Sequence, residues 1–152
     1  MVDSRQKGAR AEAAMVKLLK EATGLNWKRT PGSGALHQDH LLKGDIYIPG
    51  EYNYYCCEVK HYKEDHLTSK VLTSKIPQLL EWWKQSLRQG KQVDKIPILF
   101  FKFDRSKWFV MMLMPEKYKE DTKAIILLPE KVIIYTFDYW LKNVLQYIRW
   151  KK

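Results

Sequence analysis

The stretch GDIYIPGEYNYYCCEVK, residues 44–60, is typical of two short β-strands joined by a turn. One extended segment covers residues 45–49, the turn falls near residues 50–53, and a second extended segment covers residues 54–62. The second segment has the apolar side chains expected of a protein interior, yet it also carries charges on one face. Those charges need a physical explanation.

Three charged residues share one face of this predicted hairpin. Residues two apart on a strand point the same way, which places Glu58 beside Lys60. With the turn centred between residues 51 and 52, Asp45 lies directly opposite Glu58. Facing carboxylates repel each other, so a compensating cation is needed. Lys60 is one candidate, and a bound divalent metal is another.

The same side chains suit a magnesium or manganese site. Hard cations take oxygen ligands, often one or two carboxylates with water and substrate phosphate, and Asp45, Glu58 and the carbonyl of Val59 supply such oxygens. A metal there polarises a phosphodiester and activates water, while the ammonium of Lys60 stabilises the developing charge. Glu12 falls at the border of the apolar stripe of a predicted first helix, within reach of the metal directly or through water.

Each residue also has a simpler interpretation. An E-x-K pair is common on a solvated strand edge, Asp45 after Gly44 is typical of a turn, and Glu12 alone suits a helix surface where it pairs with a basic neighbour. The combination is more specific than its parts. It consists of a glutamate on a helix, a G-D pair that opens a strand, and E-V-K on the next strand.

The order of these motifs resembles the PD-(D/E)XK nucleases, and within them the archaeal-type Holliday junction resolvases. The motifs are RQKGARAE, RTPGSGAL, GDI and CCEVKHY, and the resemblance covers residues 4–114. It implies an α/β, restriction-endonuclease-like core: a central mixed β-sheet flanked by helices. A hairpin and a helix in residues 115–152 would extend the same single nuclease domain, which spans residues 1–152.

The resemblance also implies a role for each motif residue. Asp45 and Glu58 become metal ligands, Lys60 the catalytic lysine, and Glu12 the carboxylate that completes the site. Ser33, in the G-S-G loop, matches a serine that handles the scissile strand.

Further residues become candidate DNA contacts. Arg5 and Lys7 match basic residues that contact the DNA backbone, and we add Arg10, Arg29 and His37 to them. The sequence departs from the resolvase pattern at two places: glycine replaces proline at position 44, and the loop before it contains His37 and His40. The role of those histidines stays open, and we do not expect a structural zinc site.

Composition supports a DNA partner. The chain has 152 residues, 45% of them apolar, which suits one core, and its formal net charge is +10, which favours a polyanionic partner. An ordinary basic protein without such a partner is the alternative. The charged N-terminus and the lack of long apolar runs lead us to expect a soluble cytoplasmic protein without a membrane partner, in a prokaryotic cell or in the host of a virus. Adjacent Cys56 and Cys57 would point to opposite faces, so a disulfide is not expected.

Hydrophobic periodicity predicts the remaining elements. A first helix runs from a cap at Ser4 to Gly24, and a second, capped by Ser74, ends at Gly90 with Trp82 off its apolar stripe. The remaining predicted elements are a strand at 26–30, near-continuous apolar strands at 96–104 and 108–114, strands at 124–128 and 132–137, and a last helix capped by Asp138.

The charged residues predict a Mg²⁺- or Mn²⁺-dependent endonuclease, and the resemblance implies that it resolves four-way DNA junctions. We expect a C2 homodimer, because two symmetric cuts need two sites. One alternative is a PD-(D/E)XK nuclease acting on duplexes, flaps or ends. The other is a non-catalytic basic DNA-binding module. The cleavage position, the number of metals, the dimer surface and the source are not determined by the sequence.

Overall fold

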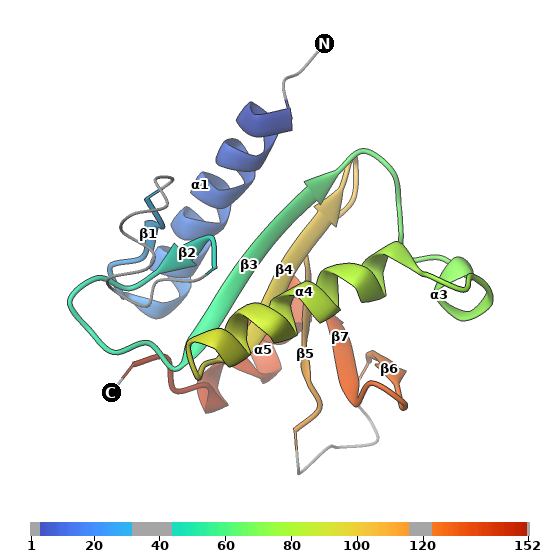
Figure 1. Ribbon diagram of the computed structural model, residues 1–152. Coiled ribbons are helices and arrows are strands. Elements are labelled where there is room, and N and C mark those ends of the chain that lie inside the picture. The colour runs from blue at the N-terminus through green and yellow to red at the C-terminus, as the bar shows by residue number, and fades with distance from the viewer. Residues whose placement is uncertain (1–3, 32–43, 116–122, 152) are drawn as a thin grey trace.

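The computed structural model describes residues 4–31, 44–115 and 123–151, which build one seven-stranded mixed sheet with helices on both faces (Figure 1). The strand order is β1-β2-β3-β4-β5-β7-β6. Within these residues no helix is long and apolar enough to cross a bilayer. The mixed sheet and the helices on its two faces confirm the α/β prediction.

The hairpin of strands β2 (Ile46–Tyr47) and β3 (Tyr55–Tyr62) has the predicted register. Ile46 pairs with Cys57 in antiparallel orientation, so the next pair along the hairpin is Asp45 with Glu58. On the outer side of β2 lies the short strand β1 (Lys28–Arg29), which pairs with it in antiparallel orientation.

Asn53 holds the turn of this hairpin. Its buried side chain accepts a hydrogen bond from the backbone N of Ile48 at 2.8 Å and donates to the carbonyls of Ile48 at 2.9 Å and Glu51 at 2.8 Å. Backbone groups of the connection that would otherwise lack partners are satisfied in this way. The side chain of Asn53 therefore fixes the register on which the position of Asp45 depends.

The centre of the sheet is formed by β3, β4 (Ile96–Phe103) and β5 (Phe109–Leu113). Strand β4 runs parallel to β3, with Glu58 beside Leu99, and pairs with β5 in antiparallel orientation. Nearly every residue of β4 is buried, as expected for a strand covered on both faces.

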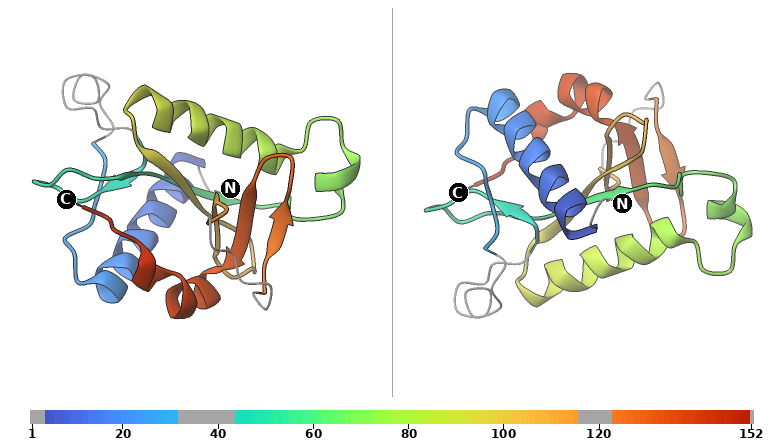
Figure 2. Two further views of the ribbon diagram at one scale, coloured as in Figure 1. Left: turned by 90° about the horizontal axis from the view of Figure 1, so that it is seen from below. Right: turned by 90° about the horizontal axis from the view of Figure 1, so that it is seen from above.

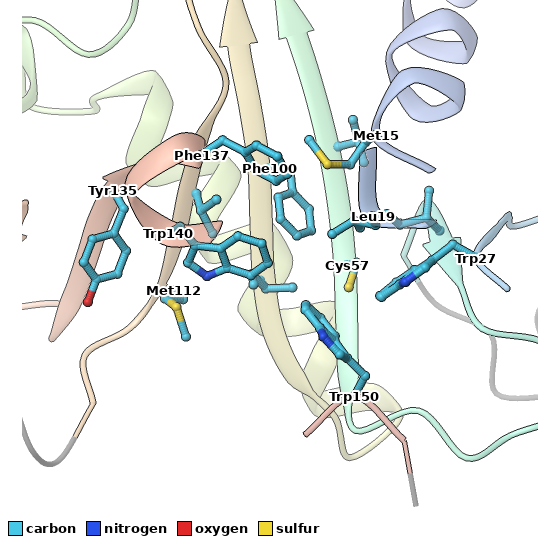
Figure 3. Packing of buried hydrophobic residues seen from close by; sticks show 14 of the residues in the cluster. Met15, Leu19, Trp27, Cys57, Phe100, Met112, Tyr135, Phe137, Trp140 and Trp150 are labelled. Atoms are coloured by element: carbon cyan, nitrogen blue, oxygen red, sulfur yellow. The ribbon is translucent and has the colours of Figure 1, made fainter. Parts of the chain in front are cut away.

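Helices cover the two faces unequally (Figure 2). Helix α4 (Gln78–Gln92) packs on one face, and α1 (Ser4–Thr23) packs on the other together with α5 (Phe137–Asn143). Figure 3 shows the core on the α1 face, which is rich in aromatic and sulfur-containing side chains. Its largest buried members include Met15, Leu19, Trp27, Phe100 and Trp140.

The C-terminal part of the chain completes the same sheet and core. Strand β7 (Val132–Thr136) pairs with β5, and β6 (Ile125–Leu127) pairs with β7 at the edge. After α5 and a 3₁₀ turn (Leu145–Tyr147), Trp150 packs against Trp27 with ring centroids 5.0 Å apart. The backbone carbonyl of Trp150 also accepts a hydrogen bond from Tyr54 N. The chain end therefore braces the hairpin.

Both predicted ends of the second helix are wrong. Ser74 ends a separate short helix, α3 (Lys70–Thr73), and α4 begins after Pro77. Proline suits this place because it has no N–H to leave unpaired at a helix start. Gly90 lies inside α4, which continues to Gln92, and it allows close packing there, because a Cβ at this position would lie 2.6 Å from the carbonyl oxygen of Lys95.

Two further side chains differ from the prediction. Trp82 is only 5% exposed, because α4 buries a wider face than a single stripe and Tyr62 stacks on the indole at 4.5 Å. Thr136 caps α5, accepting a hydrogen bond from the backbone N of Tyr139, and Asp138 lies in the first turn. The extended backbone of Thr136 gives its hydroxyl the geometry of a cap.

Asn53→Ala should lower the free energy of unfolding by about 1–3 kcal/mol, since it leaves buried backbone groups without partners. Urea unfolding followed by circular dichroism measures the change. Asn143→Ala, which removes an exposed helix hydrogen bond, is the matched control and should change stability by less than about 0.5 kcal/mol. Equal effects of the two substitutions would contradict the role given to Asn53.

Candidate active site

Asp45 is fixed to strand β3 by two hydrogen bonds. Its backbone N donates to the carbonyl of Cys57 at 2.7 Å, and its carboxylate Oδ2 accepts from the backbone N of Val59 at 2.8 Å. Strand β2 has only two residues, and its pairing with β3 ends at Cys57. The hydrogen bond from Val59 to the Asp45 side chain takes the place of the backbone bond that a longer β2 would make. The carboxylate is thereby held at the open edge of β3.

The backbone conformation at position 44 explains why glycine stands where the resolvase pattern has proline. The φ of Gly44 is +90°, and a Cβ built there would lie 2.6 Å from the carbonyl oxygen of Cys57. Proline is locked near −65° and cannot adopt this conformation. Glycine therefore allows the backbone to pass close to β3 just before Asp45.

Glu58 is buried, with 4% of its surface exposed, and its side chain is hydrogen-bonded to Asp45. Burial, the charge of Asp45 and the hydrogen bond to that carboxylate together raise the pKa of Glu58 from 4.5 to about 9. Lys60 acts in the opposite direction but does not offset these effects. In the absence of a further cation, Glu58 therefore keeps its proton at neutral pH.

Lys60 and Glu12 complete the electrostatic environment of this pair. Lys60 is partly exposed and lowers the pKa of both Glu58 and Glu12. The pKa of Glu12 is raised, first by burial and then by Asp45, against the opposing effect of Arg29. Glu12 Oε2 lies 3.7 Å from an Arg29 guanidinium nitrogen. Residues from α1, β1 and the hairpin thus converge at one edge of the sheet.

The carboxyl pair fits a hard divalent cation. Two carboxyl groups held together, one of them buried and with too little positive charge around it, are the donor set that such an ion prefers. The N–H and the carbonyl of a strand residue point to the same side, so the carbonyl of Val59 faces the edge that holds Asp45. Among the described residues, no three His, Cys, Asp or Glu side chains form a ready metal cluster, and Glu12 is paired with Arg29 instead.

The basic residues predicted to contact DNA lie on or near α1. Arg5, Arg10 and Arg29 are exposed, and Lys7 is partly exposed. Lys7 Nζ forms an ion pair with Asp104 Oδ1 at 2.7 Å. Two further predicted residues, Ser33 and His37, together with His40, lie outside the described residues.

Asp104 is a partner of Lys7 that sequence reasoning missed. It follows β4 and accepts hydrogen bonds from Lys7 and from Nε2 of His61, which is adjacent to Lys60. The hydrogen bond from Lys7 is the main reason that the pKa of Asp104 lies below its usual value. This carboxylate ties the start of α1 to the end of the central strands. Lys7 and Asp104 are 97 residues apart in the sequence, so no local pattern could have revealed their contact.

Comparison with known proteins identifies the family of this chain. The sequence matches the family described as "Phage putative PDDEXK endonuclease" over residues 3–149. The chain belongs to this endonuclease family. The prediction of a PD-(D/E)XK nuclease is confirmed, and DNA is the substrate that this family membership implies. The Asp45 position and the Glu58-Val59-Lys60 segment match the letters of the family pattern.

Two individual proteins show further similarity to this PDDEXK endonuclease. Protein D14 of Escherichia phage T5 is 40% identical over 150 residues, which cover 93% of this chain and 94% of that protein. The solved structure of Hjc, a Holliday junction resolvase from Archaeoglobus fulgidus, matches with a TM-score of 0.42 and 16% identity, covering 88% and 87% of the two chains. The second match is a distant similarity only.

A divalent cation should stabilise the folded protein, because an ion that binds only the native state raises the melting temperature. We expect Mg²⁺ or Ca²⁺ to raise the melting temperature of the wild type and of the exposed control Glu64→Gln. Asp45→Asn should lose the increase. Differential scanning fluorimetry with and without EDTA measures it, and an equal increase in all three proteins would exclude a site at Asp45.

Glu58 should make stability fall with pH in the presence of EDTA. Its pKa is raised from 4.5 to about 9 on folding, so the native state holds an extra proton between these values and loses stability as pH rises through them. Glu58→Gln cannot ionise. The melting temperature of this variant minus that of the wild type should therefore increase from about pH 5 to about pH 9. Parallel curves for Glu58→Gln and the wild type would contradict the shift, and Glu21→Gln is the exposed control.

Proposed function

We propose that this PDDEXK endonuclease is a metal-dependent, structure-selective enzyme that resolves four-way DNA junctions by phosphodiester hydrolysis. The observation that carries the proposal is the buried Glu58, hydrogen-bonded to the partly exposed Asp45, with Lys60 beside them at an open sheet edge. A buried carboxyl with a raised pKa, next to a second carboxyl and an ammonium, is typical of a catalytic site. Asp45 and Glu58, with the Val59 carbonyl, would hold Mg²⁺ or Mn²⁺.

Each side chain has a distinct role in this proposal. When bound, the cation supplies Lewis-acid polarisation of the phosphate and an activated water. Lys60 donates to the developing negative charge on the phosphate, in a place where water is partly excluded. Glu12, oriented by Arg29, adds a carboxylate that assists coordination directly or through water. Asp45 depends on its bond from Val59 for its position.

Basic residues near the start of α1 suit a DNA backbone. Arg5, Lys7 and Arg10 are at least partly accessible there, and the chain has a net charge of +10. Phosphate contacts of this kind weaken steeply as salt rises, because bound counterions are released. Ser33 and His37 are proposed to contact the substrate strand on the basis of the family resemblance alone.

The junction as substrate and the homodimer rest on the same resemblance. Two symmetric cuts in one junction need two active sites, and a C2 dimer supplies both from one gene. We propose that the enzyme acts in the cytoplasm of a prokaryotic cell, or in the host cytoplasm if it is viral. An endonuclease specific for duplexes, flaps or ends would use the same catalytic residues.

Cleavage of a synthetic four-way junction, compared with a linear duplex of the same arms, tests the proposed function. We expect Mg²⁺-dependent cutting of the junction at symmetric positions and little cutting of the duplex. Lys60→Ala should reduce the cleavage rate by about 100-fold or more while junction binding is retained. Lys63→Ala, an exposed lysine three positions along the chain, is the matched control and should cut normally.

The outcomes separate the alternatives. Equal cleavage of junction and duplex would exclude a resolvase but keep the endonuclease. Unchanged activity in both Lys60→Ala and Asp45→Asn would exclude this catalytic site. Binding without any metal-dependent cleavage of junctions, flaps or ends would favour a non-catalytic DNA-binding module.

A further inference from the structure

A groove lies at the C-terminal end of α4, away from the carboxyl pair. Its volume is about 580 Å³, and it is lined by the last turns of α4, the following turn, the start of β4 and the end of β5. Leu99 lies beside Glu58 in the sheet, and Ile96 precedes it on β4 by three residues. The groove residue Ile96 is therefore about 10 Å along the strand from the level of Glu58. Figure 1 shows this end of α4 at the opposite end of the sheet from the arrowheads of β3 and β4.

The shape of the groove depends on close backbone packing. A Cβ on Gly90 would lie 2.6 Å from the carbonyl oxygen of Lys95, so α4 lies directly against the chain that leads into β4. The Gly90 carbonyl accepts hydrogen bonds from Val93 N at 3.2 Å and Lys95 N at 2.8 Å. Asp94 between them has a φ of +53°, as a tight turn requires. The backbone that leads into β4 is therefore held close to α4 at this wall of the groove.

The groove is apolar at its centre. Leu87, Ile96 and Leu113 come from three different elements and are 37%, 45% and 39% exposed. Apolar side chains that gather in a concave, accessible place mark binding sites more often than isolated surface ones do. Burying this surface under a ligand would be favourable.

The rim of the groove is basic. Lys84, Arg88 and Lys91 follow one another at helical spacing on α4, and Lys95 follows the turn. Asp94 is the one carboxylate among the described residues that line the groove. Lys84 is paired with Glu81 at 3.4 Å. Neither Arg88 nor Lys91 has an ion-pair partner in the part of the chain that the structure describes. An anionic ligand therefore finds unpaired cations around an apolar floor.

We propose that this groove binds an acidic peptide segment of a partner protein, with apolar side chains on the floor and carboxylates on Arg88 and Lys91. Charge complementarity favours this ligand, because carboxylates steer to the rim while the apolar side chains supply contact area. A DNA backbone would use the cations but leave Leu87, Ile96 and Leu113 uncovered. A second copy across a two-fold axis would bring the basic rim against itself.

Fluorescence anisotropy with a labelled peptide of four aspartates followed by leucine and phenylalanine tests the groove. We expect saturable binding that weakens as salt rises. Two control peptides should bind much more weakly: one with asparagine for every aspartate, and one with serine for the two apolar residues.

Variants locate the binding on the protein. Arg88→Glu with Lys91→Glu should weaken binding by about tenfold or more, and Leu113→Ser should weaken it several-fold. Lys17→Glu with Lys20→Glu, the same charge change on the exposed side of α1, should bind the peptide as the wild type does. Melting temperatures equal to that of the wild type show that each variant is folded, and no nuclease activity is needed for the measurement.

Four results would overturn the proposal. They are equal binding of the control peptides, no loss in the groove variants, displacement of the peptide by duplex DNA with a matching loss of DNA binding in Arg88→Glu/Lys91→Glu, and a wild-type dimer that Leu113→Ser dissociates. The third result would assign the groove to DNA, and the fourth would assign it to a second copy of this chain.

Discussion

The attachment of Asp45 to the edge of β3 is the constraint on which the site depends. A backbone bond to Cys57 and a carboxylate bond from Val59 hold this residue on both sides of Glu58. The attachment places an acid directly against a second, buried acid, which is unfavourable unless a proton or a cation lies between them. The fold therefore holds two carboxyl groups together at one point of the sheet edge, where a proton or a cation is needed to offset their repulsion.

Other parts of the molecule support this arrangement. Gly44 allows the close approach, Asn53 fixes the turn, and the carbonyl of Trp150 binds the chain at Tyr54 next to the hairpin. Asp104 ties the start of α1, and with it the helix that carries Glu12, to the end of β4. Residues from both ends of the sequence thus stabilise a site of four side chains.

Much of this could be predicted from the sequence, because strand geometry is local. The alternation of side chains and the centre of one turn were sufficient to place Asp45 opposite Glu58, and the apolar runs were sufficient to identify the central strands. Boundaries were less predictable. Ser74 and Asp138 have the chemistry of caps, but Pro77 and Thr136 occupy those positions, since many residues satisfy the same local rule.

Contacts between distant segments could not be predicted. Trp82 was expected to lie off the buried stripe, and its burial follows from Tyr62 and from the width of the face that α4 covers. The partners of Glu12 and Lys7, namely Arg29 and Asp104, depend on how α1 crosses the sheet. The groove at the end of α4 likewise requires three elements to meet.

The most direct test of the carboxyl pair as a metal site is anomalous diffraction at the manganese absorption edge from crystals soaked in Mn²⁺. We predict an anomalous peak within coordination distance, about 2.0–2.3 Å, of carboxylate oxygens of both Asp45 and Glu58. A fully occupied manganese ion elsewhere, with no anomalous peak between these two side chains, would contradict it.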